Sequence, residues 1–269
     1  MTNVMKTDVV IAGTGVGGLF CALHLPKDTN IILITKGELE ECDSYLAQGG
    51  ICMLKNDADY DSYFEDTLRA GHYENNRESV DIMLRESQDT IKELVECGVD
   101  FERNEDGSFA FTKEGAHSTP RILFHEDVTG REITSKLLSC VKKLPNVTII
   151  EKLTMVDIVE NNGKCAGIVG RYEDGGMVQI EPDYTVFATG GIGGLYEQST
   201  NFPHLTGDAL AISLKHGVEL LNIDYIQIHP TTLYTKKKGR SFLISESVRG
   251  EGAILFNSHM ERFVDELLP

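Results

Sequence analysis

The sequence has no tryptophan and few basic residues. Its 25 lysines and arginines stand against 42 aspartates and glutamates, which gives a formal net charge of -17 at pH 7. Nucleic acids and anionic membranes both require a basic face, so this charge argues against either as a partner. A small anionic substrate is still compatible with the charge, because it needs only a local cationic pocket.

Long apolar runs are also missing. No stretch approaches the roughly 20 apolar residues of a membrane span, and residues 1–7 lack the layout of a signal peptide. The six cysteines show neither paired nor CxxC spacing. This pattern favours reduced thiols and gives no support to a zinc or iron–sulfur site. We therefore expect a cytoplasmic protein with no membrane partner and no metal centre.

The N-terminal part of the chain alternates between strand and helix signals. Residues 7–12 and 30–35 are short apolar runs typical of buried strands, and a helix is expected between them, ending near Leu25. A strand, a glycine loop, a helix and a second strand form the order of a parallel βαβ unit. Apolar spacing further predicts helices over 75–97, 129–143 and 207–216, a hairpin over 101–111 and a strand over 147–150.

The pattern changes between residues 154 and 181. Three short strand-like runs are separated by Asn162-Gly163 and by residues 174–176, which are typical hairpin turns. Residues 184–188 then return to a buried strand, and residues 220–228 are apolar and are expected to be extended. The sequence thus predicts an antiparallel meander inserted into an α/β frame with a parallel sheet.

The glycine loop carries the clearest chemical signal. The run VVIAGTGVGG places Gly13, Gly15 and Gly18 in GxGxxG spacing, after a strand and before a helix. The first glycine allows the tight turn, the second lets the backbone approach a pyrophosphate, and the third lets helix and strand pack closely. Free N–H groups at the helix N-terminus would bind the anion. The inserted meander and the later TVFATGG strand favour FAD over NAD, by analogy between folds.

One expected group is missing after the second strand. A ribose-binding carboxylate is expected there, about 20 residues past the loop, but Thr35 and Lys36 occupy the place. Either Glu38 reaches back from beyond the strand, or Lys36 and backbone groups contact the adenosine end instead. We prefer the second interpretation.

Several motifs resemble a known family. AGTGVGG, SYLAQGGI, DVTGRE, FATGG, TGDALA, QIHPT and SVRGEGA appear in the order found in the fumarate reductase/succinate dehydrogenase flavoprotein family, with the greatest likeness to its L-aspartate oxidase branch. The resemblance covers the whole chain. It implies a Rossmann-like FAD-binding domain over 1–223 and the start of an α+β capping domain over 224–269. The implied cofactor contacts are Gly13, Thr14, Gly15, Val16, Gly17, Gly18, Lys36, Ser44, Tyr45, Leu46, Ala47, Gln48, Gly49, Gly50, Val156, Thr189, Gly190, Gly191 and Asp208.

Two positions distinguish branches of this family. Respiratory members carry a histidine bonded to the flavin where this chain has Asp43, so the resemblance implies non-covalent FAD. Taken alone, Asp43 is equally a turn or helix-capping residue. Glu114 matches a glutamate that faces the substrate amino group, and a carboxylate there would select aspartate over succinate. Taken alone, Glu114 is one surface acid among 42 acidic residues.

The other candidate substrate residues lie in QIHPT and SESVRGEGA. The resemblance implies that His229, at the edge of the expected 220–228 strand, contacts a substrate carboxylate, and that Ser245 and Glu246 replace a common Thr-Glu pair. Arg249 either anchors substrate or pairs with Glu246 or Glu251. We interpret four further residues as loop and pairing residues: His117, Arg121, His125 and Arg131.

The resemblance implies FAD-dependent oxidation of L-aspartate to iminoaspartate, the first step of de novo NAD biosynthesis. Electrons would pass to oxygen or fumarate, and a quinolinate synthase would act downstream. In the family an arginine that acts as acid/base follows the segment matching RFVDELLP, whereas Pro269 is the last residue here. We therefore expect a truncated, poorly active chain. The alternatives are a second chain that supplies the remainder, a soluble fumarate reductase, and a non-catalytic dinucleotide-binding fragment.

Overall fold

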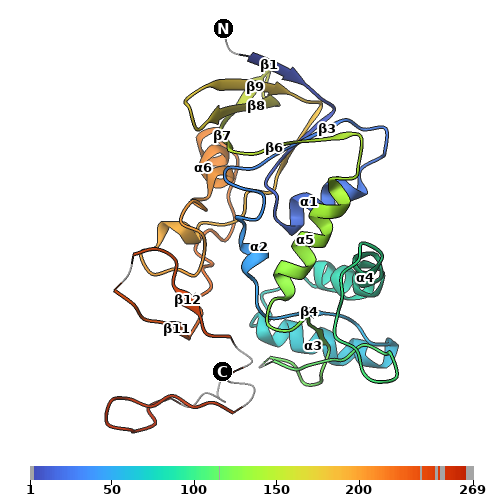
Figure 1. Cartoon of the computed structure of the whole chain (residues 1–269), viewed down its shortest axis with the longest axis vertical. Helices are drawn as coiled ribbons and strands as arrows, with labels where there is room; N and C mark the ends of the chain where they lie inside the picture. Colours follow the sequence, from blue (N-terminus) through green and yellow to red (C-terminus); the bar gives the residue numbers. More distant parts are fainter. Residues whose placement is uncertain (1–2, 115, 237, 246–247, 249–251, 265–269) are drawn as a thin grey trace. The chain divides into compact units, whose positions relative to one another are not determined.

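The chain divides into two compact units, which are treated separately below. The computed structural model describes residues 3–264 apart from 115, 237, 246–247 and 249–251. One unit, here called the sheet unit, contains residues 1–46 and 133–243, and the other, the helical unit, contains 47–132 and 244–269 (Figure 1). Each unit thus collects segments that lie far apart in the sequence.

The sheet unit contains the predicted parallel sheet. Its strand order is β10, β2, β3, β6, and every neighbouring pair is parallel. All residues of β2 and β3 are buried, as expected for parallel strands covered on both faces. The βαβ prediction is therefore confirmed. The elements are β2 (Val9–Ala12), α1 (Val16–His24), β3 (Ile31–Ile34), β6 (Val147–Ile150) and β10 (Tyr184–Phe187), together with α5 (Thr129–Val141), which belongs to this unit from residue 133 on.

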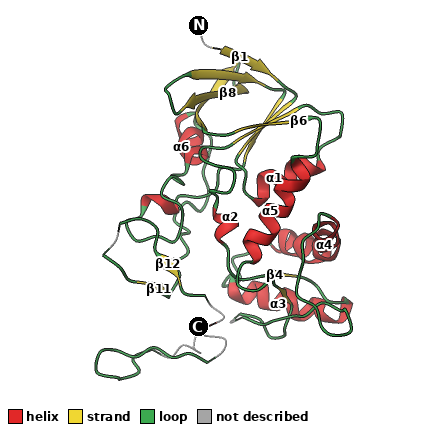
Figure 2. Ribbon diagram, viewed as in Figure 1, coloured by secondary structure: helices red, strands yellow, loops and turns green. Residues whose placement is uncertain are grey.

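The predicted meander forms a second sheet in the same unit. Strands β7 (Leu153–Asn161), β8 (Lys164–Tyr172) and β9 (Met177–Glu181) run antiparallel, and the turn between the first two has left-handed backbone at Asn162 and Gly163, as predicted. The sequence analysis missed β1 (Asn3–Lys6), which pairs with β9 in parallel (Figure 2). A shared apolar core joins the two sheets: Val10, Ala12, Ile32, Ile34, Leu153, Met155, Ile168, Val178 and Ile180.

The last part of the sheet unit is more irregular. Residues 220–228 form no helix or strand, so the prediction of an extended strand is wrong. Asn222 has left-handed backbone and accepts a hydrogen bond from the Tyr225 N–H, and this turn interrupts the run. Ile228 is 85% exposed, so apolar composition did not indicate burial. The elements here are α2 (Asp43–Leu46), η2 (Gly193–Leu195), α6 (Asp208–Lys215), β11 (Thr232–Leu233) and β12 (Phe242–Leu243).

Charged contacts fasten the end of α6 to β7 and predict a pH dependence. His216 Nε2 lies 2.7 Å from Asp157 Oδ1, and Lys215 forms an ion pair with the same carboxylate. Hydrogen bonds from Lys215 and His216 lower the pKa of Asp157 to about 2, and the hydrogen bond to Asp157 raises the pKa of His216 above 6.5.

A carboxyl group whose pKa is lowered by folding stabilises the fold at pH values above its unfolded-state pKa, and this contribution is lost as the pH falls through its folded-state pKa. A histidine whose pKa is raised by folding stabilises the fold at pH values below its unfolded-state pKa, and this contribution is lost as the pH rises through its folded-state pKa. We therefore expect the melting temperature to fall above about pH 6.5, and His216→Asn to flatten that fall. An unchanged slope between pH 6 and 8 in the variant would contradict this expectation.

The helical unit is built around two antiparallel short strands and two helices. β4 (Ile51–Cys52) pairs with β5 (Ile122–Leu123), and α3 (Tyr60–Ala70) follows the short helix η1 (Asp57–Asp59). The predicted helix is confirmed as α4 (Arg77–Glu96). The Asn76 side chain caps it by accepting from the Ser79 N–H at 3.0 Å, and Gly98 follows in left-handed conformation.

The hairpin expected over residues 101–111 is present, although short. One antiparallel bridge joins Arg103 and Phe109, backbone bonds from Asn104 N–H to Ser108 and from Ala110 N–H to Glu102 flank it, and Gly107 at the turn is left-handed. α3 has no counterpart among the predicted elements. None of the helices in the described part of the chain is both long and apolar enough to cross a membrane.

Candidate functional site

The glycine loop brings three backbone segments of the sheet unit into close contact. Gly13 has a φ of +123°, and a Cβ there would lie 2.0 Å from the carbonyl oxygen of Ala188. A Cβ at Gly18 would lie 2.0 Å from the carbonyl oxygen of Gly13. The first and third glycines therefore do what the sequence predicted, the tight turn and the close packing of helix and strand.

Ser44, in α2, lies over the N-terminus of α1. Its Oγ accepts a hydrogen bond from the Val16 N–H at 3.1 Å. A Cβ at Gly15 would lie 3.1 Å from the same oxygen. Backbone N–H groups at a helix N-terminus attract anions, so the hydroxyl marks where a phosphate oxygen would find donors. This local geometry fits a bound pyrophosphate.

A cavity of about 350 Å³ opens beside this loop. Ten predicted cofactor residues line it: Gly13, Thr14, Gly15, Gly17, Lys36, Ser44, Thr189, Gly190, Gly191 and Asp208. Eleven other lining residues are not among the predicted cofactor contacts: Ala12, Ile34, Thr35, Glu41, Cys42, Asp43, Leu153, Met155, Ala188, His204 and Leu205. Five predicted contacts of this unit do not line the cavity: Val16, Gly18, Tyr45, Leu46 and Val156. Val156 stands at a register shift in β7, beside the lining residue Met155.

Lys36 lines this cavity and is surrounded by hydrogen-bond acceptors. Its Nζ is 3.0 Å from Asp208 Oδ2 and 2.8 Å from the carbonyl oxygen of His204. Glu38 instead forms an ion pair with Lys152 at 2.7 Å and does not line the cavity. Of the two residues, Lys36 lines the cavity and Glu38 does not, and contact of Lys36 with the adenosine end stays a prediction.

Asp43 is held by the segment that follows η2. Its Oδ1 accepts from the Phe202 N–H at 3.2 Å, and its Oδ2 accepts from the Asn201 side-chain amide. Burial raises the pKa of this carboxyl. Asp43 lines the cavity, so its interpretation as a turn residue does not conflict with a place at the cofactor.

Residues 47–50 of the SYLAQGG motif belong to the helical unit. A Cβ at Gly49 would lie 3.2 Å from Glu114 Oε1, so this carboxylate reaches the backbone of the motif. A Cβ at Gly50 would lie 2.2 Å from the Leu123 carbonyl oxygen. Gln48 Oε1 is buried with no hydrogen-bond partner in the part of the chain that the structure describes. A buried acceptor without a partner in the described residues fits a segment that contacts a polar cofactor.

The remaining predicted substrate residues are placed as follows. His229 Nδ1 is 2.9 Å from the Thr231 carbonyl oxygen, in the sheet unit, and it follows an exposed irregular segment and not the predicted buried strand. Ser245, in the helical unit, donates to Asp127 Oδ1 at 2.8 Å. Glu246 and Arg249 lie outside the described residues. Because Glu114 and His229 belong to different units, a pocket shared by them stays a prediction.

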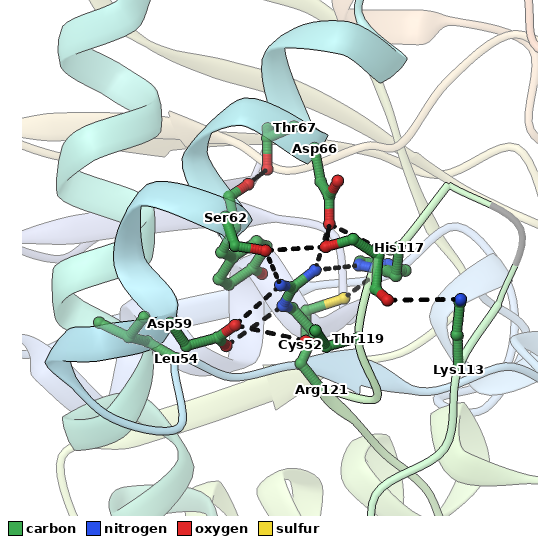
Figure 3. Close-up of polar contacts among 12 residues, drawn as sticks. Cys52, Leu54, Asp59, Ser62, Asp66, Thr67, Lys113, His117, Thr119 and Arg121 are labelled. Atoms are coloured by element: carbon green, nitrogen blue, oxygen red, sulfur yellow. Dashed lines mark hydrogen bonds and ion pairs between the residues drawn. The ribbon is translucent and has the colours of Figure 1, made fainter.

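Arg121 forms a buried ion network with Asp59 and Asp66 (Figure 3). The Arg121 side chain is fully buried, and its guanidinium donates to Asp66 Oδ2 at 2.6 Å and to Asp59 Oδ1 at 2.8 Å. Burial alone would raise the pKa of Asp66, but hydrogen bonds from Ser118 and Arg121 outweigh it and lower that pKa. The prediction of Arg121 as a pairing residue is confirmed. Nothing in the sequence marked Asp59 and Asp66 among the 42 acidic residues.

A second cavity, of about 550 Å³, borders this network in the helical unit. Its walls include Cys52, Tyr63, Met83, Ile91 and His117. Arg121 donates to His117 Nδ1 at 3.3 Å, so the other ring nitrogen, Nε2, carries the proton and faces Cys52 Sγ at 3.5 Å. The surface of the cavity is mainly apolar, and its polar lining residues also include Asp66, Thr67, Glu86, Ser87 and Thr90.

Comparison with known proteins identifies the family. Residues 8–269 match the family model described as an FAD binding domain. L-aspartate oxidases from Clostridium perfringens and Clostridium acetobutylicum are 46% and 45% identical over 97% and 98% of this chain. The chain spans 60% and 61% of the length of these relatives.

Solved structures agree with this result. An E. coli quinol fumarate reductase FrdA chain superposes with a TM-score of 0.90 at 29% identity, over 97% of this chain and 45% of that one. Mycobacterium smegmatis Sdh1 gives a TM-score of 0.85 at 29% identity, over 99% and 48%. The chain therefore belongs to the family of FAD binding domains, with FAD as its cofactor.

Proposed function

We propose that this chain is the FAD-binding and part of the substrate-binding portion of a flavin-dependent L-aspartate oxidase. The single observation that supports it best is the Glu114 carboxylate at Gly49, beside the SYLAQGG motif. Identity of 45–46% to two L-aspartate oxidases gives independent support. The activity is proposed for the natural gene product that contains these residues, because the chain spans about 60% of those relatives.

The residues of the first cavity would hold FAD without a covalent bond. The glycine loop and the N-terminus of α1 would bind the pyrophosphate, and Lys36, already paired with Asp208, would lie at the adenosine end. Asp43 offers a carboxylate engaged by residues 201–202, and a carboxylate does not form the stable flavin linkage of a histidine. Acid precipitation of the holoprotein should therefore release free FAD; yellow colour retained in the pellet would refute this.

Recognition of aspartate would depend on one added charge. Aspartate and succinate share two carboxylates, and only aspartate has an ammonium group, which a carboxylate at Glu114 would bind through charge-assisted hydrogen bonds. With Nδ1 of His229 engaged at Thr231, its Nε2 would face a substrate carboxylate. Bound FAD would supply the hydride acceptor for oxidation at the substrate Cα to iminoaspartate.

The wider role follows from the same proposal. The reaction would be the first step of de novo NAD biosynthesis, in the cytoplasm, with oxygen or fumarate accepting electrons and a quinolinate synthase consuming the product. Incubating the two purified enzymes with aspartate and measuring consumption of the imine would test the last of these statements.

Glu114→Gln tests the assignment directly. Removing the charge should lower kcat/KM for L-aspartate by about 10- to 100-fold, since hydrogen bonds to charged groups contribute about 1.5–3 kcal/mol. Flavin bleaching under anaerobic conditions measures the reductive step. Glu105→Gln, at an exposed acid of the same unit, is the matched control and should leave kcat/KM unchanged. Equal behaviour of the two variants would sink the role given to Glu114.

A soluble fumarate reductase is the second candidate, favoured by the TM-score of 0.90 to a fumarate reductase chain. It predicts that fumarate oxidises the reduced flavin rapidly while aspartate fails to reduce it. A non-catalytic dinucleotide-binding protein predicts FAD binding with neither reaction. The same anaerobic titration therefore separates all three functions.

A further inference from the structure

The segment that carries Glu114 is a loop closed by a short ladder. Residues 112–114 and 116–121, here called the Glu114 loop, begin at Thr112, whose N–H donates to the Ile122 carbonyl at 2.9 Å. The Arg121 N–H donates back to the Thr112 carbonyl at 3.2 Å. Within the loop, the His117 N–H donates to the Glu114 carbonyl at 3.1 Å. The loop is therefore pinned at its base and has one internal turn beside Glu114.

One side of this loop faces a cavity and is not closely packed. Ala116 and His117 border the cavity of about 550 Å³ in the helical unit. A side chain next to an open cavity loses the dispersion contacts that would otherwise fix it. The position of the loop must then come from its polar contacts.

Those polar contacts converge on one carboxylate of α3. Asp66 Oδ2 accepts from both the Ser118 N–H and the Ser118 Oγ, each at 2.7 Å, and from the Arg121 guanidinium at 2.6 Å. Ser118 is thus held twice by the same oxygen, four residues from Glu114. The Asp66 side chain is 4% exposed and its bond to Arg121 is buried, whereas Ser118 itself is exposed and its two bonds are partly buried.

Arg121 is fixed in turn from its other side. Its guanidinium donates to Asp59 Oδ1 at 2.8 Å and lies 4.8 Å from the centre of the Tyr63 ring. Figure 3 shows Asp59 and Asp66 pointing at this guanidinium from the start and the middle of the helical segment. Bidentate geometry of this kind orients as well as attracts. The network therefore fixes the position of the C-terminal end of the Glu114 loop.

We propose that Asp66, Ser118 and Arg121 are positioning residues that hold the Glu114 carboxylate beside Gly49, and so set the preference for dicarboxylates that carry an ammonium group. The proposal rests on the proposed function of Glu114. None of the three residues needs to touch substrate. Their effect on substrate choice passes through the loop backbone to Glu114.

Ser118→Ala is the primary test, made in the natural gene product with FAD bound. It removes the hydrogen bonds of Ser118 Oγ to Asp66 Oδ2 and to Ser62 Oγ. The Ser118 N–H bond to Asp66 remains and Arg121 and Asp66 stay paired, so no buried charge is orphaned. KM for L-aspartate should rise about 5-fold, less than the roughly 10-fold or more expected for loss of a direct bond to a charged group, because the Ser118 N–H still holds the loop to Asp66. The inhibition constant of succinate, which has no ammonium, should change less than 2-fold. In a Glu114→Gln background the same substitution should have no further effect on KM.

Ser108→Ala is the matched control. Ser108 also donates both its N–H and its Oγ to one carboxylate oxygen, that of Asp106, in a loop of the same unit. It should leave both constants unchanged. Asp66→Asn, checked for flavin content and melting temperature, gives a second variant that removes the charge and should raise the aspartate KM further.

Three results would overturn the proposal. Ser118→Ala and Asp66→Asn that both leave the aspartate KM unchanged would remove the positioning role. Equal losses for aspartate and succinate, or full additivity with Glu114→Gln, would reduce the network to a structural one while leaving the function of Glu114 intact. No effect of Glu114→Gln alone would refute the proposed function and the positioning role together.

Discussion

Replacing Arg121 by methionine is expected to lower the free energy of unfolding by about 3–5 kcal/mol, because the buried carboxylate of Asp59 loses its ion pair and Asp66 keeps only the one with Arg69. Asp59 and Asp66 lie 2.8 and 2.6 Å from this guanidinium and are 8% and 3% exposed. Methionine fills a similar volume, so the loss would come from charge and hydrogen bonding more than from a void. Urea denaturation followed by circular dichroism measures the change.

Arg85→Met is the matched comparison. Arg85 pairs with Asp81 at 2.8 Å, a distance similar to that in the buried pairs, but its side chain is 62% exposed. Exposed ion pairs of this kind contribute about 0–1 kcal/mol. If Arg121→Met and Arg85→Met lower the free energy of unfolding equally, the burial of the Arg121 network adds nothing to its contribution to stability.

Gly18→Ala is expected to cost about 3 kcal/mol of folding stability and to weaken FAD binding strongly. The added Cβ would lie 2.0 Å from the carbonyl oxygen of Gly13. Helix α1 would have to move away from the loop, and overpacking of this kind typically costs about 1–3 kcal/mol. The same movement would displace the N–H groups that face the pyrophosphate. Calorimetry without FAD measures the first effect, and flavin fluorescence titration measures the second.

Gly17→Ala, one residue earlier in the same helix, controls for the change in helix propensity. A Cβ there meets nothing within 4 Å. Alanine in a helix is favoured over glycine by about 1 kcal/mol, so the apoprotein should be as stable or slightly more stable. If Gly18→Ala and Gly17→Ala have the same melting temperature, the close approach of Gly18 to the Gly13 carbonyl is not needed for stability.

Local patterns in the sequence predicted the frame of the sheet unit well. VVIA and IILI are uninterrupted buried runs, and Asn162-Gly163 is a turn with a strong backbone preference. Strand β1 was missed because its four residues are mostly exposed and show no alternation; its place comes from pairing with β9. The strand predicted over residues 220–228 was wrong for the opposite reason. The run is apolar, but no neighbouring strand pairs with it in the described residues.

The candidate site was also only partly predictable from the sequence. The glycine spacing identified the first cavity because Gly13 and Gly18 stand where a side chain would collide with nearby backbone. Asp59 and Asp66 could not be singled out, because burial of an acid depends on which cation the fold brings to it. Arg121 did carry a signal: it directly precedes Ile122 and Leu123, both buried, where a cation needs partners.

The pairing of the first strands has a consequence for how the polypeptide forms during synthesis. Asn3 pairs with Val178 and Val9 with Tyr184, separations of 178 − 3 = 175 and 184 − 9 = 175 residues. At about 5–20 residues per second, a ribosome needs roughly 9–35 seconds between emitting the two partners. For that time β1 and β2 have no β9 and β10 to pair with, so the backbone groups of those strand edges stay exposed. A chaperone that binds nascent chains would therefore act during this interval.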